Sequence, residues 1–425
     1  MLTREENDLL TQTGPGTPGG ELMRRYWQPA ALSEELPPDG PPKAIRLFSE
    51  DLVLFRDEAG RPGLLGIHCS HRRADLSYGR IEDGGLRCPY HGWLYDVGGR
   101  CLQQPGEPKG STFKNTIRHL AYPCVEAGGV VFTYMGPGEP PLLPNYSFLT
   151  VPPDYRSNTK SIQECNWLQG LEGEIDPVHI SFLHRFFKER GPQDRAVPGG
   201  SRSINSLVGD DLAPRLEVEE ADFGVRLYAI RETSDGDYYL RMNNFVYPNI
   251  GIFSAGRPKG DGYGVNWHVP IDDVTHWKYS WTHSRTSPLD PSEARGYATN
   301  SDLNPDYTLK RNKRNRYLQD HEEMKTTSFL GMGTNFNVHD AYATEGQGEI
   351  LDRTLEHLGY SDKPIAMMRK VLLRAIRELQ DGKEPPHVIR TEADNHFPYL
   401  GGYTGLLGPS GEWQGVWKEL AVYPS

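Results

Sequence analysis

Two short segments that each contain one cysteine and one histidine constrain this chain more than any other feature. The first is Cys69-Ser70-His71, and the second is Cys88-Pro89-Tyr90-His91, sixteen residues further on. A thiolate and a neutral imidazole are both metal ligands. A Cys₂His₂ set also suits a structural Zn²⁺ ion, but zinc fingers take both cysteines from one segment and both histidines from another. Here each segment supplies one of each, as a cluster of two irons requires.

This ligand set predicts a [2Fe–2S] cluster of the Rieske type, in which two histidines replace two cysteines on one of the irons. Cys69 and Cys88 would hold one iron, and His71 and His91 the other. Such a cluster transfers electrons, so the rest of the chain must show where they go. A zinc-stabilised protein and a protein that only transfers electrons remain the alternatives.

The sequence around the two segments is typical of an all-β module. From about residue 44 to residue 134, short runs rich in β-branched and aromatic residues alternate with turns that contain Gly, Asp or Pro. The proline-rich stretch 136–144 is typical of a linker. A chain of 425 residues is too long for one ordinary core. We therefore predict two domains, residues 1–150 and 151–425.

The second domain is predicted to combine long helices with an antiparallel sheet, which makes the chain an α+β protein. Helices are expected at about 164–190, 309–329 and 363–380, and strands of alternating polarity lie between the first two. The basic run 310–316 would lie on a solvated helix face or form a docking patch for an acidic redox partner.

A second candidate metal site lies near the start of this domain. Asp176, His179 and His184 form the pattern Asp-x₂-His-x₄-His. Two histidines and one carboxylate form the facial triad of non-haem Fe(II) sites that activate O₂. Positions five apart on a regular helix point about 140° away from each other, so the histidines share a metal only if the helix is broken between them. Two ordinary structural histidines are the alternative.

Together these motifs resemble the large terminal subunit of Rieske non-haem iron oxygenases, the aromatic-ring hydroxylases. The resemblance is greatest to the phthalate dioxygenase-like branch, which includes aromatic O-demethylases. It rests on the two Cys/His segments, on Asn166-Trp167 and Glu172-Gly173 before the Asp-x₂-His-x₄-His pattern, and on the stretch 345–359. It implies a helix-grip (START-like) catalytic domain and an oxygenase of EC class 1.14.

The resemblance also implies a role for each residue of the second site. His179 and His184 would bind the catalytic iron together with Asp340, which lies shortly before the stretch 345–359. Relatives usually have Gln before this aspartate, where this chain has His339.

Asp352 is the reserve candidate for the third ligand. Asp176 would connect a histidine of the catalytic iron in one subunit to a cluster histidine in the next, and electrons would cross it. The implied assembly is a homotrimer or a dimer of trimers.

The implied partners are O₂, a small aromatic substrate and a separate NADH-dependent reductase, with or without a ferredoxin. The expected reaction is hydroxylation of an aromatic carboxylate similar to phthalate, and oxidative O-demethylation of a methoxylated aromatic acid is the alternative. A buried carboxylate needs a cationic partner. The candidates are Arg202, Arg226, Arg231 and Arg241, of which Arg241 is preferred.

Charge and composition argue against several other classes of protein. A net charge of −11 does not suit a nucleic-acid-binding protein. No window approaches about 18 consecutive apolar residues, so no membrane span is expected. The acidic N-terminal segment is unlike a secretory signal, and five cysteines, an odd number, fit a reducing compartment. We therefore predict a cytoplasmic protein.

Overall fold

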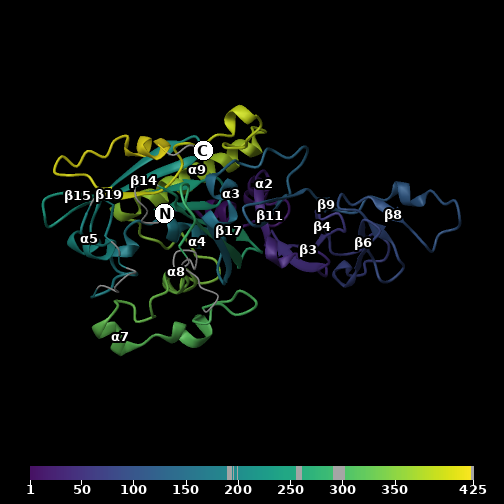
Figure 1. Cartoon of the computed structure of the whole chain (residues 1–425), viewed down its shortest axis with the longest axis horizontal. Helices are drawn as coiled ribbons and strands as arrows, with labels where there is room; N and C mark the ends of the chain where they lie inside the picture. Colours follow the sequence, from purple (N-terminus) through teal and green to yellow (C-terminus); the bar gives the residue numbers. More distant parts are fainter. Residues whose placement is uncertain (189–193, 195, 199, 255–260, 291–301, 423–425) are drawn as a thin grey trace.

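The computed structural model describes residues 1–188, 194, 196–198, 200–254, 261–290 and 302–422. A β-rich end projects from a larger body that contains both helices and strands (Figure 1). In this view β3 to β9 lie on the right, and the helices α4, α8 and α9 lie in the body to the left.

Two four-stranded antiparallel sheets form the β-rich end. The first has the order β2 (Lys43–Leu47), β3 (Glu50–Arg56), β4 (Pro62–Gly66) and β9 (Ala121–Tyr122). The second has the order β5 (Arg80–Glu82), β6 (Gly85–Arg87), β7 (Leu94–Tyr95) and β8 (Cys101–Gln103). Some of their apolar side chains form a separate core that includes Cys69 and Cys88, so both Cys/His segments are anchored in it.

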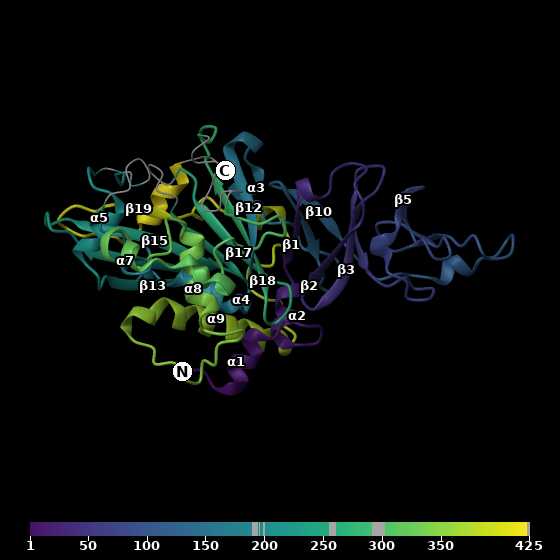
Figure 2. The same cartoon turned by 90° about the horizontal axis from the view of Figure 1, so that it is seen from below.

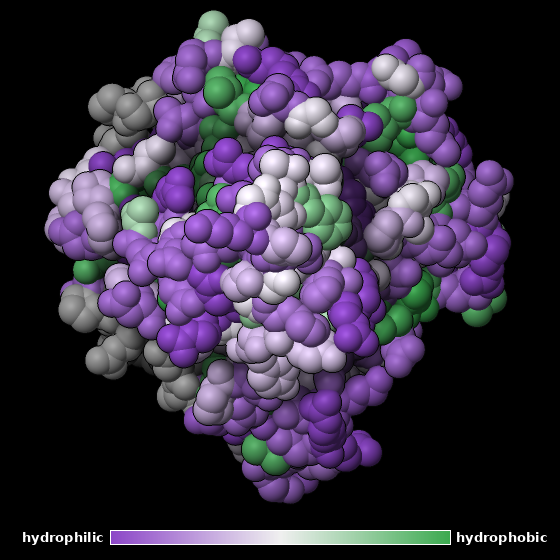
Figure 3. Space-filling model, turned by 90° about the vertical axis from the view of Figure 1, so that its right-hand side faces the viewer, coloured by the Kyte–Doolittle hydropathy of each residue, from purple (hydrophilic) through white to green (hydrophobic). Residues whose placement is uncertain are grey.

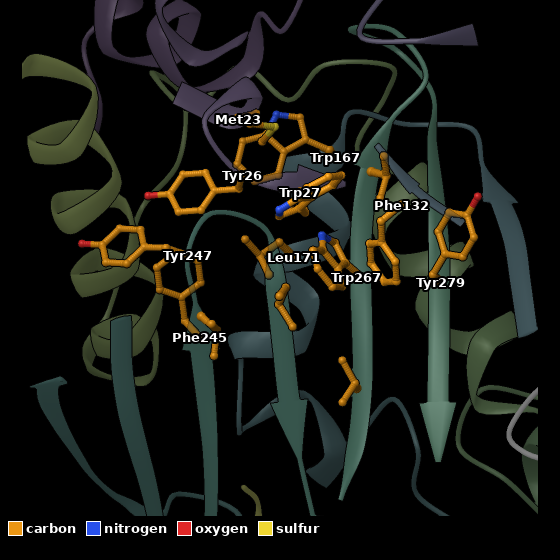
Figure 4. Packing of buried hydrophobic residues seen from close by; sticks show 14 of the residues in the cluster. Met23, Tyr26, Trp27, Phe132, Trp167, Leu171, Phe245, Tyr247, Trp267 and Tyr279 are labelled. Carbon is orange, nitrogen blue, oxygen red and sulfur yellow. The ribbon is translucent and has the colours of Figure 1, made fainter. Parts of the chain in front are cut away.

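A three-stranded sheet joins this end to the body. Its order is β1 (Trp27–Leu32), β11 (Val130–Tyr134) and β10 (Cys124–Ala127). Figure 4 shows Trp27 and Phe132 from this sheet packed beside Trp267 of the large sheet. The rings of Phe132 and Trp267 are 5.4 Å apart. The largest hydrophobic core of the molecule therefore runs across both sheets.

The body is built on a large antiparallel sheet. Its strands follow the order β12 (Arg156–Gln163), β18 (His276–His283), β17 (Gly264–Pro270), β16 (Ile250–Phe253), β15 (Tyr238–Val246), β14 (Gly224–Glu232) and β13 (Arg215–Ala221). β19 (Tyr403–Leu406) pairs with the first half of β15, where β16 does not reach. The register of β17 and β18 places His268 directly opposite Lys278.

The long helix α9 (Lys363–Gln380) packs on β13 and β14, and its predicted bounds are confirmed. The N-terminal helices α1 (Arg4–Thr11) and α2 (Pro18–Arg24) pack on α9 beside the body (Figure 2). α4 (Trp167–Ile175) lies over β16 and β17 and contacts α8 (Phe336–Glu345). The remaining short helices are α3 (Ser147–Thr150), α5 (Ile204–Asp210) and α7 (His321–Thr326). The predicted α+β organisation, with a helix gripped by an antiparallel sheet, is confirmed.

The prediction of a helix at 309–329 is wrong. The segment contains the 3₁₀ turn η8 (Lys313–Leu318) and the separate helix α7. Arg316 and Tyr317 have φ values of 52° and 54°, in the left-handed region, which ends a regular helix. The basic run lacks apolar residues at helical spacing, so it has no face to bury.

No helix in the described part of the chain is long and apolar enough to span a bilayer.

Candidate functional site

The two Cys/His segments fold into matching loops. The backbone amide of Cys69 donates to Ala74, and its carbonyl accepts from Arg73. Cys88 makes the same pair of bonds with Trp93 and Gly92. Arg73 and Gly92, each four residues after its cysteine, both have positive φ, at 61° and 75°. The two loops therefore present their cysteines and histidines in equivalent ways.

The side chains of these loops suit a shared metal cluster. Cys69 and Cys88 are buried, and the rings of His71 and His91 are 4.5 Å apart. The Nδ1 atom of His91 has no hydrogen-bond partner among the described residues, as expected for an atom that is available to a metal. Burial raises the pKa of Cys88, and the neighbouring Cys69 adds to this effect. A bound cation would reverse it by stabilising both thiolates.

Tyr95 is a further member of this site that the sequence did not reveal. Its hydroxyl lies 3.2 Å from the Sγ atom of Cys69, inside the core of the β-rich end. Hydrogen bonds to the cluster sulfurs help to set the reduction potential of iron–sulfur clusters. Tyr95 is thus placed to tune the cluster.

The expected helix at 164–190 is interrupted where the second site needs a break. α4 ends at Ile175, and between there and residue 188 the only helical element is the 3₁₀ turn η5 (His179–Ser181); residues 189 and 190 of the expected helix lie outside the described part of the chain. The Asp176 carboxylate accepts from the amides of Val178 and His179 at 2.7 and 3.3 Å, which fixes this turn. The histidines of the Asp-x₂-His-x₄-His pattern therefore do not lie on one regular helix.

The structure brings His179, His184 and Asp340 together. One ligand atom from each lies within 4.8 Å of the other two, although Asp340 comes from the distant helix α8. The Nε2 atom of His184 is 3.0 Å from Oδ1 of Asp340. Asp352 is not part of this cluster, since its carboxylate pairs with Arg4 and accepts from Thr354.

Hydrogen bonds fix which ring nitrogen each histidine offers to a metal. The Nδ1 of His179 donates to the backbone carbonyl of Asp176 at 2.6 Å. His339 donates from Nε2 to the carbonyl of Gly333 at 3.0 Å, so its Nδ1 accepts from Nδ1 of His184 at 3.2 Å. In both ligand histidines Nε2 is therefore left with a free lone pair, the form that binds a metal.

The surroundings of the site favour a neutral His184 and an ionised Asp340. Burial lowers the pKa of His184, which keeps it a neutral imidazole. Burial alone would raise the pKa of Asp340, but His184 and Lys278 hold it well below its usual range. Two neutral imidazoles and one carboxylate are a suitable donor set for non-haem Fe(II).

A buried ion pair lies behind the triad. The ammonium of Lys278 on β18 is 2.7 Å from Oε1 of Glu174 and 3.6 Å from Oδ2 of Asp340. Burial lowers the pKa of Lys278, but these two carboxylates outweigh it and the net shift is upward. Sequence reasoning missed Lys278 and Glu174, because nothing in their local pattern indicates that they meet.

The four candidate arginines have different surroundings. Arg202 is held by Asp210 on α5. Arg226 packs on the Trp417 ring, with 4.3 Å between the guanidinium carbon and the ring centre. Arg202 is thus already paired with a carboxylate, whereas the Nε of Arg226 has no hydrogen-bond partner among the described residues.

Arg231 and Arg241 lie on the face of the sheet that is turned towards η5. Residues directly opposite each other share a face, and the register pairs Ala229 with Arg241. Arg231 is fully buried, and its Nη2 donates to the carbonyl of Pro177 at 3.0 Å. Its Nη1 has no partner among the described residues, and burial lowers its pKa to about 10.

Comparison with known proteins places the chain in a family. The Rieske [2Fe-2S] domain matches residues 26–122, and the domain described as LigXa C-terminal domain like matches residues 133–420. The 5,5'-dehydrodivanillate O-demethylase oxygenase subunit of Sphingobium sp. strain SYK-6 is 35% identical, over 93% of this chain and 85% of that protein. The phthalate 4,5-dioxygenase oxygenase subunit of Pseudomonas putida is 38% identical, over 90% and 88%.

Solved structures share the fold at lower identity. The terminal oxygenase of carbazole 1,9a-dioxygenase from Nocardioides aromaticivorans has a TM-score of 0.57 at 20% identity, over 88% of this chain and 97% of that chain. The oxygenase in a reduced complex with ferredoxin, also of carbazole 1,9a-dioxygenase, has a TM-score of 0.57 at 22% identity, over 92% and 97%.

The chain has an all-β module with paired Cys/His loops, and an antiparallel-sheet domain with a cluster of two histidines and a carboxylate follows it. This combination defines the class of oxygenase subunits with two metal centres. The chain belongs to the Rieske non-haem iron oxygenases, as the oxygenase subunit of a multicomponent system. Its cofactors are a Rieske [2Fe–2S] cluster and a mononuclear non-haem iron.

Proposed function

We propose that this oxygenase subunit hydroxylates an aromatic carboxylate of the phthalate type. The observation that carries the proposal is the convergence of His179, His184 and Asp340, with both Nε2 atoms free for a metal. The substrate class is supported by the relatives whose names contain phthalate and 3-chlorobenzoate. Dioxygenation adds both atoms of O₂ to the ring as a cis-diol and consumes two electrons and two protons.

On this proposal each metal group has its own ligands. Cys69, His71, Cys88 and His91 hold the cluster, and His179, His184 and Asp340 hold the mononuclear iron. When bound, the iron supplies the activation of O₂. The protein keeps both histidines in the correct tautomer and keeps Asp340 ionised.

Asp176 is proposed to carry electrons between subunits. Its side chain is 27% exposed, and Oδ2 lies 3.9 Å from Nδ1 of His179. Figures 1 and 2 both show β5 to β8, next to the cluster loops, far from α4 and α8. A cluster in the same chain is therefore poorly placed to reduce this iron, and a neighbouring chain must approach Asp176. We infer a homotrimer or a dimer of trimers.

The substrate carboxylate is proposed to bind at Arg241 and Arg231. The Nη1 of the buried Arg231 lacks a partner among the described residues, and the half-buried Arg241 lies on the same face of the sheet. A buried guanidinium without a carboxylate is costly, and a bound carboxylate would offset that cost.

Binding of phthalate to the reduced enzyme tests this assignment. Loss of a charge-assisted hydrogen bond costs about 1.5–3 kcal/mol, so Arg241→Ala should bind phthalate about 10- to 100-fold more weakly. Arg226→Ala is the matched control, because Arg226 lies on the opposite face of the sheet and packs on Trp417. Unchanged affinity in Arg241→Ala would exclude this arginine.

Oxidative O-demethylation is the second candidate, favoured by the 35% identical dehydrodivanillate O-demethylase subunit. In that reaction a methoxyarene, O₂, two electrons and two protons give a phenol, formaldehyde and water. Turnover of phthalate and of methoxylated benzoates with a surrogate reductase separates the two, since only demethylation releases formaldehyde. The electron-transfer-only alternative does not hold for a member of this family.

The electron donor is proposed to be a separate NADH-dependent reductase, with or without a ferredoxin. Figure 3 looks onto the β-rich end, whose surface consists mostly of hydrophilic residues. A polar surface suits a redox partner that binds briefly and leaves.

We also propose that the chain divides into two domains, residues 1–150 and 151–425. We further propose a cytoplasmic location, which the five cysteines without a disulfide support.

A further inference from the structure

A lysine is buried where the three elements of the mononuclear site meet. The side chain of Lys278, the third residue of β18, is 1% exposed. The carboxylate of Glu174 comes from α4, which leads directly into Asp176 and His179, and the carboxylate of Asp340 comes from α8. One ammonium group therefore connects the sheet to α8, which carries Asp340, and to α4, which leads into the segment with the two histidines.

The contacts of Asp340 divide its two oxygens. Oδ1 faces Nε2 of His184 at 3.0 Å, and Oδ2 faces the ammonium of Lys278 at 3.6 Å. Oδ1 therefore faces the histidines, and Oδ2 faces the positive charge behind them.

Glu174 is the other carboxylate that Lys278 contacts, and Lys278 is its close partner. The Nε2 of the buried His268 is 3.7 Å away and has no hydrogen-bond partner among the described residues. His276 donates from Nδ1 to the Cys165 carbonyl, so its Nε2 accepts from Nδ1 of His268 at 3.0 Å. A neutral His268 then presents only a lone pair to Glu174. The 2.7 Å bond from Lys278 is therefore the contact that holds Glu174.

We propose that Lys278 is a positioning residue that separates the two carboxylates. It binds Glu174 and the outer oxygen of Asp340, so that the iron receives a single carboxylate oxygen and keeps open positions. This role rests on the iron site proposed above. On this proposal, removing Lys278 weakens the binding of iron. Coulomb forces alone predict the opposite, because the loss of a positive charge would tighten the binding of a cation.

Lys278→Met tests the proposal with Fe(II) loaded in the absence of O₂. The EPR spectrum of the nitric oxide adduct reports the ligand geometry at iron, and competition with a chelator gives the iron affinity. We expect a changed EPR signal and an affinity about 10- to 100-fold weaker, the usual loss when the partner of a metal ligand is removed. The visible spectrum of the [2Fe–2S] cluster should not change.

Lys160→Met is the matched control. Lys160 is also buried and paired with a glutamate, Glu35, but it lies on the opposite face of the same sheet. Its substitution should leave the EPR signal and the iron affinity as in the wild type. A wild-type signal in Lys278→Met, or tighter iron binding, would overturn the proposal.

The double variant Glu174→Gln/Lys278→Met removes both charges and separates positioning from charge balance. The double variant should still bind iron weakly and give a changed EPR signal, because Asp340 still lacks its partner. Full restoration would show that Lys278 only neutralises Glu174. If neither variant folds, a crystal structure of the iron-loaded wild type decides the question: Asp340 bound through Oδ1 alone supports the proposal, and binding through both oxygens contradicts it. A wild-type protein that holds no mononuclear iron would contradict the proposed site itself.

Discussion

At the residue scale, His339 shows how a neighbour determines the chemistry of a metal ligand. It stands where relatives usually have Gln, and the structure gives it a definite task. Its Nδ1 accepts a hydrogen bond from Nδ1 of His184, and its own Nε2 donates to the carbonyl of Gly333. Burial lowers the pKa of His339 to about 4, so it stays neutral and remains an acceptor.

His339→Leu should weaken the binding of mononuclear Fe(II) by about 10- to 100-fold, because His184 loses the acceptor that orients its ring. Anaerobic titration of iron against a chelator measures this, and the absorbance of the [2Fe–2S] cluster serves as the control for folding. His339→Gln keeps an acceptor oxygen and should retain most of the affinity. Equal iron affinity in His339→Leu and the wild type would refute the orienting role.

At the scale of elements, α4 depends on close contact with the sheet beneath it. A Cβ atom on Gly170 would lie 2.5 Å from both His268 Nδ1 and His276 Nε2. The glycine therefore allows the helix to lie directly over these two imidazoles, which belong to β17 and β18.

Gly170→Ala should destabilise the protein by about 1–3 kcal/mol through overpacking, and it should lower the melting temperature. Gly173→Ala in the same helix is the matched control, since its Cβ meets only Thr344 Cγ2, at 3.4 Å. Alanine is the better helix former, so the control should melt at the wild-type temperature or slightly above it. Identical melting of the two variants would show that α4 can move away from the sheet without cost.

The elements differ in how well the sequence predicts them. α9 has a strong apolar face and clear end signals, so its bounds follow from local pattern. The segment 309–329 has no such face, and contacts with the rest of the fold decide its conformation. The break after Ile175 is predictable only because two histidines five residues apart cannot share a metal on a regular helix.

The residues of the site also differ in how well the sequence predicts them. The residues in the Cys/His segments and in the Asp-x₂-His-x₄-His pattern are evident from spacing. Tyr95, Lys278 and Glu174 carry no local signal, because their roles arise from contacts between distant segments. Lys278 lies on β18, a strand buried on both faces, so alternation along the strand does not distinguish it.

At the scale of the whole molecule, the two centres of one chain lie at different ends. The cluster loops belong to the projecting β-rich end, and the triad lies in the body (Figure 1). Electron transfer from one subunit to the next would explain why Asp176 is held at the surface beside His179.

Mixed oligomers test this route. Asp176→Asn alone should keep both metal centres but lose nearly all turnover, and Cys69→Ser alone should lose the cluster. When the two variants are mixed at random, about one interface in four joins an intact cluster to an intact Asp176. About a quarter of the wild-type rate should therefore return. No recovery in oligomers verified as mixed would show that electrons do not cross between subunits.

The central claim is that one chain holds a two-iron cluster and a separate iron bound by His179, His184 and Asp340. Counting iron and acid-labile sulfide in the wild type and in Asp340→Ala, together with the visible spectrum, tests it most directly. We predict about three irons and two sulfides per wild-type chain, and about two irons with an unchanged cluster spectrum in the variant. A variant that retains all three irons, or a wild type with only the cluster irons, would contradict it.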